Sequence, residues 1–441
     1  MFSNEALKKL IIPLVIEQTL AMLVGIIDTI MVSCVGEAAI SGVALVDMMN
    51  YLIMVVLAAV ATGGAVIVSQ YLGSKEYDKA NVSANQLIMI AFVVSMAIML
   101  ICLFLHSDII KILFGSITAD VELASNTYFF ITALSFPFLG VYNSAAAIYR
   151  SMEKTNITMY IAILENIINV VGNAIGIFVI KAGIAGVAVP TLVSRMAAAI
   201  IMLCFAMNKR NIVYIKVRKV FNFDKSVVGK ILKIAVPNGI ENGLFALGRV
   251  LVTSIVALFG TSQIAANGVA NSVDQISIIV VNAINLAIIT IVGQCMGAGE
   301  IEQAEIYTKK LMKISYISTG VLGVMVCAML PLILGLYLLE EDTRSLSIIL
   351  IIIHNTLAFL LHPTSFNLAN SLRASGDVKI TMFVGIGSML IFRLGVAYIL
   401  AIVCGLGVIG VWIAMGADWL ARSAAFTVRY KSGSWKNIKV I

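Results

Sequence analysis

The sequence repeats itself once, at an offset of 224 residues that stays constant along the chain. Pro13 matches Pro237, and four residues later Glu17 matches Glu241. The same offset relates further identical pairs: Gly36 and Gly260, Ile40 and Ile264, Gln70 and Gln294, Gly73 and Gly297, Glu76 and Glu300, Gly183 and Gly407, and Gly186 and Gly410. Internal duplication of an apolar chain is typical of membrane transporters, so we expect two similar halves that lie in a lipid bilayer.

Long apolar runs fill both halves of the chain. The sequence is 61% hydrophobic and 12% charged, with a mean hydropathy of +1.03, which excludes a soluble protein with an ordinary polar surface. Continuous runs of about 20 residues or more cross a bilayer as helices and are too long for barrel strands. We therefore predict an all-α membrane protein with twelve transmembrane helices in two six-helix repeats, at residues 10–34, 47–71, 84–107, 122–149, 157–180, 184–207, 229–258, 270–297, 310–338, 345–372, 379–404 and 407–427.

The most polar stretch joins the two copies. We predict an N-terminal six-helix lobe over residues 1–207, a cytoplasmic linker over 208–228, and a C-terminal six-helix lobe with a short basic tail over 229–441. Because six is even, both copies enter the membrane from the same side, as parallel repeats with a cavity expected at their interface. Gly73 and Gly297 should stop the second and eighth helices as glycine C-caps.

The net charge of +7 is explained by membrane topology and does not require a nucleic-acid partner. If the N-terminus is cytoplasmic, basic residues gather in every cytoplasmic segment, which is the positive-inside pattern. The opposite side has only Lys111, Lys181 and Arg344, beside several acids. We therefore expect both termini in the cytoplasm.

Ionisable residues inside the apolar runs are candidates for function, because each costs a few kcal/mol in the bilayer. Glu17 and Asp28 share one face of the first helix, and Asn166, Asn169 and Asn173 form a stripe on the fifth. A carboxylate with amide oxygens suits a hard cation, and a carboxylate removed from water can equally hold a proton. Alternatively, the asparagines only tie helices together through hydrogen bonds.

Other polar residues are assigned to the cavity with less definite roles. Glu17 and Glu241 each follow a proline that can bend its helix, although a glutamate near a helix end could instead reach interfacial water. Arg249 should neutralise Glu241 or a neighbouring acid. His362 could titrate as a proton carrier or be an ordinary core histidine. A metal site at His354 and His362 would need more ligands than the sequence offers, so we predict none.

Several motifs resemble those of multidrug and toxic compound extrusion (MATE) transporters. They are Pro13-x-x-x-Glu17, Val24 to Val32 around Asp28, Ser69 to Gly73, Val292 to Gly297, Leu372 to Asp377 and Gly407 to Trp412. The resemblance covers nearly the whole chain. It implies two six-helix lobes that form a V, and alternating access that expels cationic, amphipathic drugs in exchange for Na⁺ or H⁺.

By the same resemblance, Asp28 is the coupling carboxylate of the first lobe, with Asn169 and Asn173 beside it, and Glu241 matches an acidic position of helix seven. Two positions depart from the family pattern. Some members carry an acid where this chain has Asn173, and some carry one on helix ten near the place of His362.

Two rival functions differ in class. A flippase for lipid-linked precursors would need a strongly basic cavity, whereas we find few helix-embedded basic residues, namely Arg195, Arg249 and Arg393. Enzyme motifs and nucleotide-binding loops are missing, so we predict no enzyme and no cofactor beyond the coupling ion. We expect a monomeric antiporter of small cationic organic compounds, surrounded by lipid in a bacterial cytoplasmic membrane.

Overall fold

Helices are the regular secondary structure of the chain in the computed structural model, which describes residues 2–115, 118–335, 337 and 339–441. No strand occurs among the described residues. The chain divides into two compact units, Phe2–Gly239 and Ile240–Val440, and we describe each by itself. The helical fold predicted from the apolar runs is confirmed.

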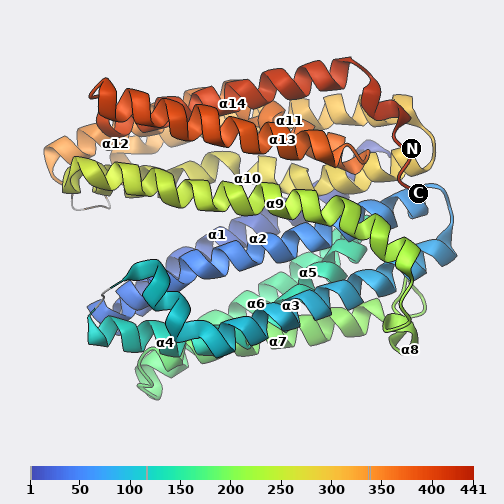
Figure 1. Ribbon diagram of the computed structural model, residues 1–441, viewed down its shortest axis with the longest axis horizontal. Helices are drawn as coiled ribbons and strands as arrows, with labels where there is room; N and C mark the ends of the chain where they lie inside the picture. Colours follow the sequence, from blue (N-terminus) through green and yellow to red (C-terminus); the bar gives the residue numbers. More distant parts are fainter. Residues whose placement is uncertain (1, 116–117, 336, 338) are drawn as a thin grey trace. The chain divides into compact units, whose positions relative to one another are not determined.

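The N-terminal unit contains the helices of the first repeat (Figure 1). The apolar runs are helical, because a helix satisfies its own backbone polar groups in lipid. Ser3 caps the first helix by accepting a hydrogen bond from the Ala6 N–H at 3.1 Å. The elements are α1 (Asn4–Ser33), α2 (Glu37–Gly73), α3 (Tyr77–Phe114), α4 (Ala119–Ala133), α5 (Phe136–Ser151), α6 (Thr155–Ala174), the π-helix η1 (Ile175–Val179), α7 (Ala185–Ala206) and α8 (Val217–Val220).

The C-terminal unit repeats this order. Helix α9 (Lys225–Val256) begins in the N-terminal unit and continues into the C-terminal one. It is followed by the 3₁₀-helix η2 (Ala257–Phe259), α10 (Thr261–Gly297), α11 (Ile301–Gly335), α12 (Glu341–Ala374), α13 (Val378–Ser388), the π-helices η3 (Met389–Gly395) and η4 (Tyr398–Val403), α14 (Gly407–Lys431) and the 3₁₀-helix η5 (Ser434–Asn437). In Figure 1, α13 and α14 run side by side along this unit.

The predicted spans correspond to these helices. Ten described helices are long and apolar enough to cross a membrane, and the bent pair α4 and α5 could form an eleventh span. The bend of 46° falls just before Pro137, which lies in the first turn of α5, where its missing N–H is tolerated. The twelfth predicted span is α14, which is less apolar because it carries Asp418 and Arg422.

Close backbone contacts recur at equivalent places of the two units. A Cβ added to Gly186 on α7 would lie 2.7 Å from the backbone of Gly176 in η1. In the other unit, a Cβ added to Gly410 on α14 would lie 2.7 Å from the backbone of Ala401 in η4. Glycine is needed at both positions because the neighbouring helix leaves no room for a side chain.

The glycines that end α2 and α10 are not the left-handed caps that we predicted. Gly73 and Gly297 are still helical, and each is followed by a right-handed residue. The left-handed residue comes two positions after each glycine, at Lys75 with φ of 62° and at Gly299 with φ of 75°. The helices end at the predicted places, but the turn that stops them lies further along the chain.

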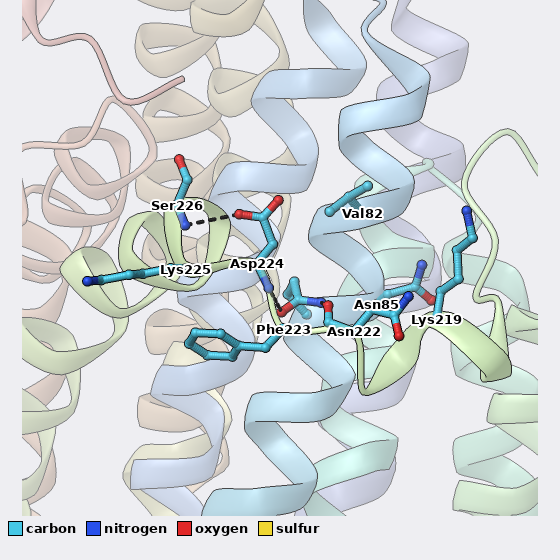
Figure 2. A pocket seen from close by; sticks show the side chains of 9 residues that line it. Val82, Asn85, Lys219, Asn222, Phe223, Asp224, Lys225 and Ser226 are labelled. Atoms are coloured by element: carbon cyan, nitrogen blue, oxygen red, sulfur yellow. Dashed lines mark hydrogen bonds between the residues drawn. The ribbon is translucent and has the colours of Figure 1, made fainter.

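The linker is folded against α3. Asn81 accepts a hydrogen bond from the Tyr214 N–H, and Asn85 accepts one from the Lys216 N–H, both at 2.8 Å. Gln86 accepts from the Asp224 N–H at 3.1 Å and donates to the Asn222 carbonyl at 2.8 Å. Figure 2 shows this contact at a pocket of about 520 Å³, with Asn85 and Val82 on α3 beside Asn222 and Asp224 of the linker. Three amide side chains therefore hold the linker backbone in place.

Candidate functional site

The Asp28 carboxylate on α1 is held by the asparagines of α6. The Asn173 amide donates to Asp28 Oδ1 at 2.9 Å. The Asn169 side chain lies at the same distance from this oxygen, and its partners place its nitrogen toward Asp28 and its oxygen 3.1 Å from the Thr191 hydroxyl on α7. Two residues of the predicted asparagine stripe, Asn169 and Asn173, thus contact the predicted carboxylate, and α7 contributes a hydroxyl that sequence reasoning did not identify.

One acceptor at this site is unused. Asn173 Oδ1 is buried and makes no hydrogen bond, while the Asn173 nitrogen donates to Asp28. A buried polar atom without a partner is rare and calls for an explanation. Because an amide oxygen and a carboxylate are both ligands for hard cations, the vacant oxygen beside Asp28 fits a cation.

A second carboxylate, which sequence reasoning missed, lies near the first. Asp47 on α2 receives side-chain hydrogen bonds from Asn50 and Tyr128, and it repels Asp28 electrostatically. Arg195 on α7 attracts both carboxylates. Asp28 is half-buried and Asp47 is exposed on its unit. Asp47 is the first residue of the second predicted span, and its spacing of three from Asn50 was the available signal.

Glu17 makes an ion pair inside the N-terminal unit. Its carboxylate is paired with the Arg150 guanidinium at the end of α5, and it accepts a hydrogen bond from the Thr158 hydroxyl on α6 at 3.1 Å. The Glu17 side chain is only 10% exposed. This residue therefore joins three helices, and its charge is neutralised within the protein.

Glu241 makes the corresponding ion pair in the C-terminal unit. Arg373 Nη2 on α12 lies 2.6 Å from Glu241 Oε2, and both side chains are buried. We had expected Arg249 to neutralise Glu241 or a neighbouring acid. The ion-pair partner of Glu241 is Arg373. Arg249 lines a small cavity with Arg393, and its pairing with a neighbouring acid stays a prediction. Arg373 belongs to the buried part of α12.

His362 lies among aromatic rings. It stacks on Phe366 with ring centroids 4.2 Å apart, and it meets the edge of Trp419 at 5.0 Å. His354 contacts the same Trp419 and lies 3.1 Å from the Asp274 carboxylate on α10. In the described part of the chain, no group of three or more His, Cys, Asp or Glu side chains could hold a metal ion.

Comparison with known proteins identifies the fold and the family. The MatE family model matches residues 13–175 and again residues 237–399, so it matches most of the chain in two copies at the offset of the repeat. The chain belongs to the MATE family. This confirms the resemblance found in the motifs, and it makes the protein a membrane transporter of this family rather than an enzyme.

Similar sequences come from several bacteria. The chain is 29% identical to the uncharacterized transporter YisQ of Bacillus subtilis, over 96% of this chain and 93% of that protein. It is 25% identical to a probable multidrug resistance protein NorM of Thermotoga maritima, over 99% and 94% of the two chains. It is 22% identical to the multidrug export protein MepA of Staphylococcus aureus, over 95% and 92%.

Solved MATE structures share the fold. A crystal structure of MATE in complex with MaL6 matches with a TM-score of 0.91 at 20% identity, over 98% of this chain and 97% of that one. The outward-facing conformation of a multidrug resistance MATE transporter matches with a TM-score of 0.91 at 19% identity, over 98% and 96%. At this level of identity the likeness concerns the fold, so the roles of individual residues must come from their own contacts.

Proposed function

We propose that this protein is a cation-coupled antiporter that exports small cationic organic compounds across a bacterial cytoplasmic membrane. The observation that carries the proposal is the Asp28 carboxylate, held by two asparagine amides beside the vacant Asn173 oxygen. An ionisable side chain within a membrane-spanning helix costs free energy, and such residues mark ion pathways. The coupling ion is Na⁺ or H⁺, because a carboxylate with an amide oxygen binds either.

Exchange follows from competition at the N-terminal unit. A cation bound at Asp28 changes the hydrogen bonds of Asn169 and Asn173, which link α1 to α6 and α7. If these bonds differ between the two access states, the cation favours the state with low affinity for cargo. Reciprocity requires that bound cargo lower the affinity for the cation by the same factor.

The relatives support the cargo class and the location. The NorM and MepA proteins named above are called multidrug resistance or multidrug export proteins, which motivates small organic compounds as cargo. They come from bacteria, and the described helices are long and apolar enough for a multi-pass membrane protein. The distribution of basic residues favours cytoplasmic termini.

Dye efflux from proteoliposomes tests the proposal. A fluorescent organic cation is loaded, and either a Na⁺ gradient or a pH gradient is imposed. We expect one gradient to drive efflux in the wild type, and Asp28→Asn to reduce the driven rate at least about tenfold, since the variant keeps the hydrogen-bonding shape of the site but cannot be charged. Asp78→Asn, at an exposed aspartate of α3, is the matched control and should behave like the wild type.

If Asp28→Asn exported the dye at the wild-type rate, Asp28 would not be the coupling residue. If neither gradient moves the dye through the wild type, the antiporter proposal fails, and transfer of a lipid-linked precursor between leaflets becomes the function to measure.

A further inference from the structure

The linker between the two repeats exposes apolar side chains. Phe221 and Phe223 are 66% and 65% exposed, and Val217 is 58% exposed. All three fall within seven consecutive residues, so they are gathered on one short segment rather than scattered over the surface. Gathered apolar side chains at a surface mark interaction sites. The segment 217–225, which carries them, is therefore a candidate interaction surface.

The backbone of segment 217–225 is fixed, so the exposure of these rings is built into the fold. Val220 is only 7% exposed and anchors the segment. Gln86 on α3 donates to the Asn222 carbonyl at 2.8 Å and accepts from the Asp224 N–H at 3.1 Å. Phe223 lies between these two bonded residues, so its backbone position is set by α3.

A ring contact with α3 places this segment beside the apolar surface of the N-terminal unit. The Phe221 ring meets the Phe92 ring edge-on, with the two centroids 6.4 Å apart. Phe92 lies eight residues after the start of the predicted span 84–107, which is about 12 Å along the helix axis. The next residue, Val93, is 54% exposed, as a side chain that faces lipid would be. Phe221 therefore lies near the level where headgroups meet acyl chains.

Basic residues accompany the exposed rings. Arg218, Lys219 and Lys225 belong to the same segment, and all three are exposed. The segment has one acid, Asp224, whose carboxylate accepts a hydrogen bond from the Ser226 N–H at 3.0 Å and so caps the start of α9. Lys219 and Lys225 both line the pocket of about 520 Å³ between the linker and α3 (Figure 2). The segment therefore combines apolar rings with an excess of positive charge.

We propose that segment 217–225 is a membrane-surface anchor that binds anionic lipid. Phe221 and Phe223 enter the headgroup layer, and Lys219 and Lys225 bind the phosphate of an anionic headgroup at the pocket that they line. Apolar rings beside basic side chains are the combination by which interfacial segments hold an anionic leaflet. Membrane topology explains the basic residues of a linker, but it does not explain the exposed rings. This inference goes beyond the export function and depends on neither the coupling ion nor the cargo.

Depth-dependent quenching tests the insertion of the rings. The six native cysteines are replaced, and Phe223→Cys carries the environment-sensitive fluorophore NBD in the full-length protein. Nanodiscs of phosphatidylcholine and phosphatidylglycerol contain a lipid with a nitroxide near the top of one acyl chain. We expect this nitroxide to quench most of the fluorescence of the label at position 223. The matched control is Asp78→Cys, an exposed position about 20 Å from Phe92 along α3 and outside the predicted span, where quenching should be weak.

Nitroxide lipids of different charge test the anionic partner. The nitroxide is placed either on phosphatidylglycerol or on phosphatidylcholine, and the fluorophore stays at position 223. Attraction of one lysine to an anionic lipid surface changes binding by a factor of about five. Phosphatidylglycerol should therefore quench the label at a mole fraction at least about fivefold lower than phosphatidylcholine. The double variant Lys219→Gln with Lys225→Gln should remove this preference. Lys75→Gln with Lys79→Gln, which removes two exposed lysines near the start of α3, should keep it.

A second measurement uses the protein with its native cysteines. Trypsin can cleave the segment after Arg218, Lys219 and Lys225, and we expect anionic nanodiscs to slow this cleavage at least about fivefold relative to neutral ones. Cleavage in the turn 75–79 of the same sample corrects for the effect of lipid charge on the protease. Equal corrected rates in the two lipids would overturn the anionic site. Quenching at position 223 no stronger than at position 78 would overturn the insertion, since the rings would then lie in water.

Discussion

The two repeats agree in the ion pair that follows each proline and differ in the site further along the same helices. Glu17 with Arg150 and Glu241 with Arg373 occupy corresponding places, although the arginine is shifted by one residue in the repeat register. By contrast, the acidic Asp28 corresponds to Val252. The comparison teaches that both copies keep an ion pair that joins helices, whereas the carboxylate that accepts hydrogen bonds from α6 has no acidic counterpart in the C-terminal copy.

The largest effect on stability is expected when the arginine of either ion pair, Arg150 or Arg373, is replaced. The size of the loss should differ between the two units. Arg373→Met leaves the Glu241 carboxylate buried, at 3% exposure, and should lower the free energy of unfolding by about 3 kcal/mol. Arg150→Met should cost less, about 2 kcal/mol, because Glu17 keeps the Thr158 hydrogen bond. Melting temperatures of the purified variants measure the difference. The double variant Glu241→Gln with Arg373→Met should recover part of the loss, and an equal loss in the two units would contradict the role given to Thr158.

The smallest expected effect concerns the turns after α2 and α10. Lys75 adopts the left-handed conformation that Gly299 adopts in the other repeat, and a side chain is strained there. Lys75→Gly should raise the free energy of unfolding by about 0.5–1 kcal/mol, and Gly299→Ala should lower it by about 1 kcal/mol. Chemical or thermal unfolding of the two variants checks the opposite signs. A stabilising Gly299→Ala would mean that the turn differs from the one described.

The spans could be predicted from the sequence because bilayer length and backbone hydrogen bonding leave few choices for a long apolar run. Helical periodicity places Asn169 and Asn173 on one face of α6, and the family resemblance correctly placed them beside Asp28. The partners of the glutamates could not be predicted. Glu17 and Arg150 are 133 residues apart, and only the packing of α1 against α5 and α6 brings them into contact.

The repeat carries a signal that was present in the sequence and not used. The offset of 224 residues pairs Asp28 with Val252 and Asn169 with Arg393, so the loss of the acid and the gain of an arginine could be read directly. Only the fold shows that Val252 and Arg393 line one small cavity of about 60 Å³.

The attachment of the linker to α3 has a mechanical consequence. The chain between the two halves has little slack, because its backbone is fixed by Asn81, Asn85 and Gln86. The boundary between the compact units falls after Gly239, within α9 and two residues past Pro237, whose nitrogen cannot donate the usual helical hydrogen bond. We therefore expect the covalent connection between the two units to be rigid, with a single site of bending at Pro237. A rotation of α9 in one unit should then be transmitted along the helix to the other unit.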